Sequence, residues 1–136
     1  MADTSPPSSK SGSKGLILVS EDDATTLRLL GQVMQRGGYQ VALAADGIEA
    51  VKHLKTARPD LIILDLKMPN MDGFALMELL HKYQSAAAIP ILVLTGSRDA
   101  FDFDRALSLD VTDYLLKPIS PKALLIKVRQ VLKHTK

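Results

Sequence analysis

Five short apolar runs alternate along the chain with segments in which apolar residues recur every three or four positions. A continuous apolar run of this length is typical of a strand buried on both faces, whereas the wider spacing is typical of an amphipathic helix. The predicted strands are Leu16–Val19, Tyr39–Ala44, Leu61–Leu64, Ile91–Leu94 and Tyr114–Leu116. Strands that alternate with helices predict the α/β class, as a doubly wound parallel sheet of five strands with five helices on its two faces.

The segments with helical spacing are bounded by capping residues, glycines and prolines. Their apolar stripes are Leu27, Leu30 and Met34; Ile48, Val51 and Leu54; Leu76, Leu79, Leu80 and Tyr83; and Leu124, Leu125, Val128, Val131 and Leu132. Gly37 and Gly38 end the first predicted helix. Asp46 caps the second, and Pro121 suits the first turn of the last. The segment Ala100–Leu109 has no clean apolar stripe, which favours a mobile helix.

Composition limits where the protein works and what it contacts. Met1 to Lys14 has almost no apolar residues and is predicted to be a disordered tail before one domain at 15–136. The chain has no cysteine, no secretory signal and no apolar run near the ~20 residues that span a bilayer. We therefore expect a cytoplasmic protein that does not contact a membrane. The formal net charge of +2 is too small to indicate DNA binding.

Polar residues follow four of the five predicted strands. They are Glu21 and Asp22 after the first, Asp65 after the third, Thr95 at the end of the fourth and Lys117 after the fifth. In a parallel sheet the carboxyl ends of the strands lie at one edge, and ligands bind there. We therefore expect these five side chains to converge although they are far apart in sequence.

Three carboxylates in one cleft repel each other unless a cation lies between them, and an all-oxygen site suits Mg²⁺, with Mn²⁺ as a possible substitute. Lys117 adds a second positive charge beside the acids. A metal ion and an ammonium group around one carboxylate fit a carboxylate that acquires a phosphoryl group, and Asp65 is the candidate nucleophile. The Thr95 hydroxyl could donate to a phosphoryl oxygen, and Gly96 would let its backbone N–H approach.

Each of these residues also has an ordinary structural interpretation. Asp22 or Asp23 could only cap the first helix. Thr95 could be a normal strand residue, and Lys117 could be a solvated lysine. The interpretation as a site depends on all of them occurring together at consecutive strand ends.

Together these residues resemble the receiver domain of two-component response regulators, in particular the stand-alone chemotaxis-type regulators, from about Leu16 to Leu132. The motifs are the acid pair Glu21-Asp22, the sequence LIILDLKMPNMDG that contains Asp65, LVLTG ending at Gly96, and YLLKP starting at Tyr114. The resemblance implies a flavodoxin-like sheet with strand order 2-1-3-4-5. It also implies phosphorylation of Asp65 by a sensor histidine kinase or a phosphotransfer protein.

The resemblance assigns further roles residue by residue. Mg²⁺ would be bound by Asp22, Asp65 and the backbone carbonyl of Lys67, with Glu21 acting through water. Lys117, through a cis bond to Pro118, would pair with the phosphoryl group. Thr95 would move toward that group and Tyr114 would turn inward, which would change the face formed by the segment 100–109, the last strand and the last helix.

Two positions would tune the lifetime of the acyl phosphate. Lys67 lies two residues after Asp65, and Ser97 lies two residues after Thr95. We hypothesise that Lys67, which is long and cationic, shields the phosphoryl group from attacking water. Two departures from the common pattern, Ser20 before the acids and Val111-Thr112 before the last strand, do not change the chemical residues.

The expected function is a phosphorylation-dependent switch that catalyses only its own phosphorylation and dephosphorylation, as a monomer or a phosphorylation-dependent dimer. The chain ends four residues after Leu132, so we expect output through a downstream protein and not through DNA. A receiver fragment of a hybrid kinase or larger regulator, and a degenerate scaffolding receiver, remain as alternatives. An aspartyl-phosphate phosphatase would need an acid where Lys67 stands, and a nucleotide-binding module would need a glycine-rich phosphate loop.

Overall fold

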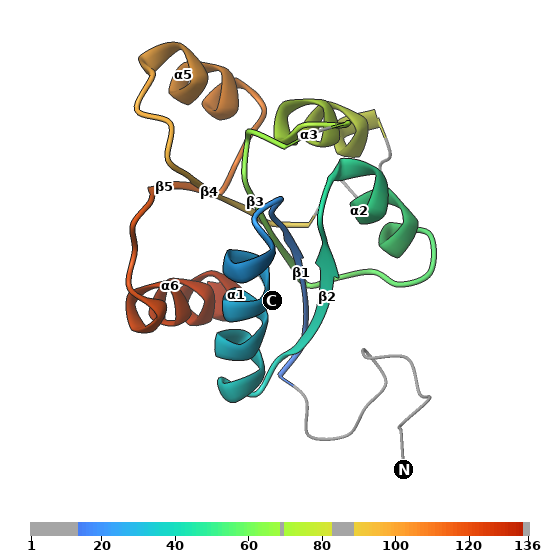
Figure 1. Ribbon diagram of the computed structural model, residues 1–136, viewed down its shortest axis with the longest axis vertical. Coiled ribbons are helices and arrows are strands. Elements are labelled where there is room, and N and C mark those ends of the chain that lie inside the picture. The colour runs from blue at the N-terminus through green and yellow to red at the C-terminus, as the bar shows by residue number, and fades with distance from the viewer. Residues whose placement is uncertain (1–13, 69, 83–88, 135–136) are drawn as a thin grey trace.

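The computed structural model describes residues 14–68, 70–82 and 89–134, and within them it contains five strands and five helices (Figure 1). In chain order these are β1 Leu16–Ser20, α1 Ala24–Arg36, β2 Gln40–Ala44, α2 Gly47–Leu54, β3 Leu61–Leu64, α3 Gly73–Lys82, β4 Ile91–Thr95, α5 Ala100–Ser108, β5 Asp113–Leu116 and α6 Pro121–His134. Three predictions fall outside the described residues: the tail before Lys14, Pro69 in the loop after β3, and Tyr83 at the end of the third predicted helix.

The strands form one parallel sheet in the order β2-β1-β3-β4-β5. This confirms the doubly wound α/β fold and the strand order that the sequence resemblance implied. Ser20 at the end of β1 is in register with Leu64 at the end of β3, and Leu64 is in register with Val93 of β4. The register therefore places the carboxyl ends of the three central strands side by side, where the polar residues follow.

The helices cover the two faces of the sheet unequally. In Figure 1, α1 and α6 lie on one side of the sheet, and α2, α3 and α5 lie on the other. Alternate strand residues serve the two faces: Ile17 and Val19 pack with α1 and α6, whereas Leu18 packs with the opposite cluster. Each central strand is thus buried on both sides, which explains why its sequence is a continuous apolar run.

The α2 stripe differs from the packing in the structure, whereas α5 agrees with its sequence pattern. Ile48 was expected in the core, but its side chain is exposed, and α2 buries Gly47 and Ala50 instead. In α5 the absence of a clean stripe has a structural counterpart. Phe101 is 72% exposed, and α5 buries only Asp102 and Ala106. The larger apolar residues Phe103 and Leu107 of α5 are also exposed.

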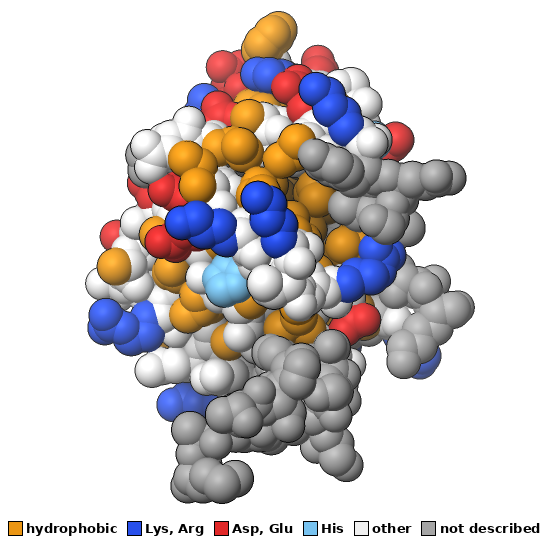
Figure 2. Space-filling model, turned by 90° about the vertical axis from the view of Figure 1, so that its right-hand side faces the viewer, with side chains coloured by type: hydrophobic (Ala, Val, Ile, Leu, Met, Phe, Trp, Pro, Cys, Tyr) orange, Lys and Arg blue, Asp and Glu red, His pale blue; other side chains and the backbone are white. Residues whose placement is uncertain are grey.

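The surface and the helix lengths fit the small net charge and the absence of a long apolar segment. On the side of the molecule where α2 lies, basic, acidic and hydrophobic side chains are interspersed (Figure 2). Among the described residues, no helix combines the length and the apolar character needed to cross a membrane.

Candidate functional site

Three carboxylates meet at the carboxyl edge of the sheet. Glu21 and Asp22 follow β1 and Asp65 follows β3, and one oxygen from each lies within 4.8 Å of the others. Glu21 is 3% exposed and Asp65 is 7% exposed, whereas Asp22 is exposed to solvent. The Asp65 backbone N–H donates to the Ser20 carbonyl at 3.0 Å, so sheet hydrogen bonding holds the acid beside the end of β1.

Asp23, and not Asp22, caps α1. Its carboxylate accepts hydrogen bonds from the Thr26 N–H at 2.9 Å and from the Thr26 hydroxyl at 2.6 Å. This resolves an alternative that the sequence left open. Because the neighbouring acid satisfies the helix end, the Asp22 carboxylate is not needed as the N-cap.

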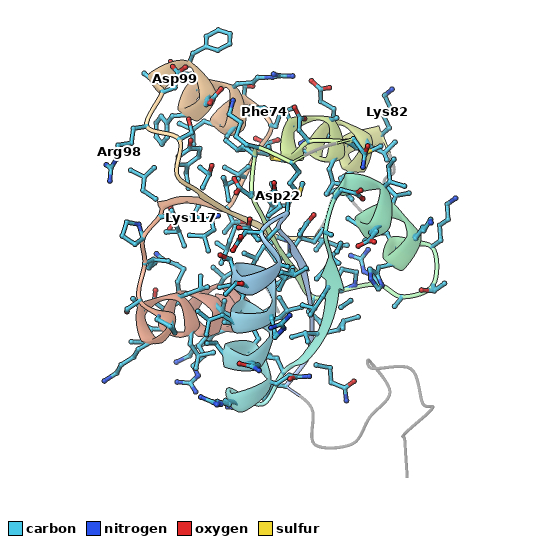
Figure 3. The ribbon with its side chains drawn as sticks, in the orientation of Figure 1. Asp22, Phe74, Lys82, Arg98, Asp99 and Lys117 are labelled. Carbon is cyan, nitrogen blue, oxygen red and sulfur yellow. The ribbon has the colours of Figure 1, made fainter. Side chains whose placement is uncertain are left out.

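Lys117 completes the cluster from the end of β5. Its Nζ contacts Glu21 Oε1 and lies 3.0 Å from Asp65 Oδ2. The Lys117-Pro118 bond is cis, as the resemblance implied. Burial by itself lowers the pKa of the Lys117 ammonium, but the hydrogen bonds to Glu21 and Asp65 outweigh it and leave this pKa above its ordinary value. Figure 3 labels Lys117 and Asp22 near this edge of the sheet.

Glu21 is in an unfavourable position for a charge. Burial raises the pKa of its carboxyl, and the hydrogen bond from Lys117 offsets this only in part. Its second oxygen, Oε2, accepts the Asp23 backbone N–H at 3.0 Å. Glu21 is therefore fixed by two partners and holds Lys117 between itself and Asp65.

The loop after β3 wraps around Asp65. The Lys67 backbone N–H donates to Asp65 Oδ1 at 3.3 Å, and the Gly73 N–H donates to the Leu66 carbonyl at 3.1 Å. The loop is also tied to the start of α2, since Asn70 Nδ2 donates to Asp46 Oδ2 at 2.7 Å. Asp46 thus has a second role beside capping α2, which the sequence pattern did not reveal.

Thr95, Ser97 and Tyr114 lie on β4, in the loop after it and on β5, and hydrogen bonds connect them. Thr95 is buried, its carbonyl accepts the Lys117 N–H at 2.8 Å, and its hydroxyl oxygen accepts the Ser97 N–H at 3.3 Å. The Tyr114 hydroxyl donates to the Ser97 carbonyl at 3.2 Å, and its ring meets that of Phe103 edge-on at 5.1 Å. A Cβ added at Gly96 would meet no atom within 4 Å, so packing does not require glycine there.

Asp102 is a polar residue of this region that sequence reasoning missed. It is 8% exposed on α5, and its Oδ2 accepts the Ser97 hydroxyl at 2.7 Å and lies 3.3 Å from Lys67 Nζ. The Ser97 hydrogen bond holds the pKa of this carboxyl below its ordinary value; burial opposes the effect and Lys67 adds to it. The available sequence signal was the helical spacing of Asp102, four residues before the buried Ala106, but a stripe of apolar residues does not include an acid.

The donor set of the cluster suits a hard divalent cation. Glu21, Asp22 and Asp65 offer carboxylate oxygens only, and Asp22 lies on the solvent side. Mg²⁺ keeps several waters and takes few protein ligands, so a shallow site with one exposed acid fits its chemistry. The cluster therefore has the composition of a magnesium site next to an ion-paired carboxylate.

Comparisons with known proteins all indicate the same family. The sequence profile of the response regulator receiver domain matches residues 17–129. The chain is 38% identical over 119 residues to the alkaline phosphatase synthesis transcriptional regulatory protein PhoP of Bacillus subtilis, a match that covers 88% of this chain and 49% of PhoP. The chain thus spans about half the length of this relative, and the expectation that it acts without a DNA-binding segment stays a prediction.

Two solved structures have the same fold. The signal receiver domain of a signal transduction histidine kinase from Syntrophus aciditrophicus has a TM-score of 0.83 at 37% identity, covering 90% of this chain and 92% of that one. The receiver domain of a sensor histidine kinase from Pseudomonas aeruginosa PAO1, with magnesium coordinated in its active site cleft, has a TM-score of 0.80 at 28% identity, covering 88% and 98%. Its fold, its site composition and its sequence place this chain in the family of response regulator receiver domains, the phosphorylation-dependent switches of two-component signalling.

Proposed function

We propose that Asp65 accepts a phosphoryl group from the phosphohistidine of a sensor histidine kinase or a phosphotransfer protein, in a Mg²⁺-dependent reaction. The observation that carries the proposal is the placement of the Asp65 carboxylate, which lies beside two other acids and 3.0 Å from the Lys117 ammonium. A nucleophilic carboxylate needs nearby positive charge once it carries a phosphoryl group. Glu21 and Asp65 hold Lys117 where it can supply that charge.

The reaction follows from the residues around Asp65. A carboxylate oxygen attacks the phosphorus, a P–O bond forms, and the P–N bond breaks with its electron pair leaving on the imidazole nitrogen. Asp22, Asp65 and the Lys67 carbonyl would hold Mg²⁺ or Mn²⁺, with Glu21 acting through water, and the bound metal supplies charge neutralisation at the phosphoryl oxygens. Thr95, at the end of β4, would donate its hydroxyl to the phosphoryl group, with the Gly96 N–H nearby.

The output would be a population shift in the face formed by α5, β5 and α6. Thr95 and Tyr114 connect the site to this face, because both contact Ser97 in the loop that precedes α5. Large hydrophobic side chains are exposed there: Phe101, Phe103 and Leu107 on α5, Leu116 on β5 and Ile126 on α6. Exposed apolar side chains on a switching face support output through a downstream protein.

Phosphorylation by a small donor tests the proposal directly. We expect acetyl phosphate with Mg²⁺ to add one phosphoryl group to the wild-type chain, measured by intact mass, with acetate as the leaving group. Asp65→Asn should show no gain, because the amide is not a nucleophile. A gain that persists in Asp65→Asn, or that needs no divalent metal, would contradict the proposed site.

Mg²⁺ should also stabilise the fold without any phosphodonor. Because the ion binds only the assembled carboxylates, a concentration of 100 times the dissociation constant should add about 2.7 kcal/mol to the free energy of unfolding and raise the melting temperature by roughly 10 °C. Asp22→Asn should remove most of this shift, since it deletes the exposed ligand. Asp104→Asn, a change to an exposed acid on α5, is the control and should keep the full shift. Equal shifts in both variants would place the ion elsewhere.

A further inference from the structure

Asp102 joins the loops that follow β3 and β4, two neighbouring strands of the sheet. It is a nearly buried acid on the inner face of α5, where Ala106 is the other buried residue. A buried carboxylate needs hydrogen-bond or charge partners. Its Oδ2 accepts the Ser97 hydroxyl at 2.7 Å and lies 3.3 Å from the Lys67 ammonium nitrogen. One partner belongs to the loop after β4 and the other to the loop after β3.

Lys67 and Ser97 also form hydrogen bonds with candidate site residues. The Lys67 backbone N–H donates to Asp65 Oδ1 at 3.3 Å, while its side chain, 67% exposed, extends to Asp102. The Ser97 N–H donates to Thr95 Oγ1, and the Ser97 carbonyl accepts the Tyr114 hydroxyl. A continuous series of contacts therefore runs from Asp65 through Asp102 to Tyr114. In this arrangement the Lys67 ammonium is paired with Asp102 and not with Asp65.

We propose that Asp102 is a positioning residue that holds the resting arrangement of the switch through its contacts with Lys67 and Ser97. The inference rests on the proposed function, because release would occur when Asp65 becomes phosphorylated. A phosphoryl group carries up to about two negative charges, against one on Asp102, so it competes for the Lys67 ammonium. When the Lys67 side chain moves to the phosphoryl group, Asp102 loses this ion pair and keeps its hydrogen bond with Ser97. The loop that contains Ser97, whose carbonyl accepts the Tyr114 hydroxyl, is then less constrained.

The inference changes the role expected for Lys67. A lysine that only shields the phosphoryl group would affect the lifetime of the phosphate and nothing in the unphosphorylated protein. A lysine that also pairs with Asp102 stabilises the resting state, so its removal should alter Tyr114 before any phosphorylation. Because Lys67 is largely exposed, its pairing is worth little, and we expect the resting-to-switched equilibrium to change by about two- to fivefold.

The test uses Asp102→Asn, Lys67→Gln and the double variant in the full chain. Asp102→Asn keeps an oxygen that can accept the Ser97 hydroxyl, and Lys67→Gln changes an exposed side chain, so loss of folding does not decide the result. The control is Glu78→Gln, which removes an exposed ion pair between α3 and Arg105 of α5, at 3.4 Å, and leaves Lys67, Ser97 and Asp102 unchanged. This control shows whether an effect on Tyr114 comes from the loss of any ion pair on α5 or specifically from the loss of the Asp102 contacts.

The first readout needs no phosphodonor. The chain has three tyrosines, so 3-fluorotyrosine labelling gives three ¹⁹F resonances, and Tyr114→Phe identifies the one from Tyr114. Asp102→Asn and Lys67→Gln should each move the Tyr114 resonance in the same direction, and the double variant should move it no further than the larger single change. Glu78→Gln should leave it in place. An unchanged Tyr114 resonance in Asp102→Asn would overturn the inference.

The second readout is the initial rate of phosphorylation by acetyl phosphate, measured by intact mass. Asp102→Asn should raise the rate about two- to fivefold, because the switched arrangement is more populated before reaction, and the effect should be absent when Lys67 is already changed. Independent, fully additive effects of the two substitutions would contradict the inference. A wild-type chain that is not phosphorylated would refute the proposed function, whereas the Tyr114 resonance would still test the Asp102 contacts.

Discussion

Gly73→Ala is expected to lower the free energy of unfolding by about 3 kcal/mol, because it forces an extra carbon against the backbone that carries Asp65. A Cβ at position 73 would lie closer than 3.0 Å to the Asp65 carbonyl oxygen and to the Leu66 Cα. Both are backbone atoms, so no side-chain rotation relieves the contact. The Gly73 N–H also donates to the Leu66 carbonyl at 3.1 Å, which fixes the start of α3 against the end of β3.

The same substitution should impair the site as well as the fold. Relief of the contact shifts the Asp65 backbone, the start of α3 or both, and a displacement of Asp65 near 1 Å can cost about 100-fold in a reaction that depends on positioning. We expect phosphorylation by acetyl phosphate to slow by tenfold or more in the folded fraction. Urea unfolding followed by circular dichroism measures the stability loss, and a 3 kcal/mol loss lowers the urea midpoint by roughly 1–2 M.

Gly96→Ala is the matched control for Gly73→Ala. It makes the same chemical change at the same edge of the sheet, but the added Cβ would meet no atom within 4 Å. Its urea midpoint should stay close to that of the wild type. If both alanine variants lose similar stability, the cost comes from replacing glycine at this edge of the sheet and not from the contact with Asp65.

The sequence predicted the fold and the site to different depths. The strands could be located because each central strand is buried on both faces, which leaves a continuous apolar run such as Leu61–Leu64. The placement of Asp65 and Lys117 at one edge followed from parallel strand direction alone. Both features can be predicted from short stretches of sequence. The structure has the predicted topology.

What the sequence did not predict depends on how side chains pack across elements. Ile48 fits an apolar stripe but is exposed, because the smaller Ala50 faces the sheet. The burial of Asp102 is not predictable from its own segment, because Ser97 and Lys67, which compensate it, lie on other segments. The choice of Asp23 as the cap of α1 likewise depends on the local backbone, since both neighbouring acids fit the motif.

Lys117→Met is the second substitution with a large expected effect, and it should lower the free energy of unfolding in metal-free buffer by about 2–3 kcal/mol. Methionine fills a similar volume but leaves Glu21, which is 3% exposed, and Asp65 without their shared cation. Much of the cost is the unpaired buried charge on Glu21, not the loss of the contact itself. The measurement is urea unfolding at neutral pH, with the metal removed by chelation.

If charge on Glu21 causes the loss of stability, the effects of substitutions at Glu21 and Lys117 on the free energy of unfolding should not be additive. Adding Glu21→Gln to Lys117→Met should recover at least half of the lost stability, because the amide carries no charge and its oxygen can still accept the Asp23 N–H. Mg²⁺ should also recover part of it by placing a cation among the remaining acids. Lys127→Met is the control, since the Lys127–Asp113 pair at 2.9 Å is partly exposed on both sides and should be worth less than about 1 kcal/mol. A double variant no more stable than Lys117→Met would show that the lysine acts through packing, and that charge on Glu21 does not set the stability of the site.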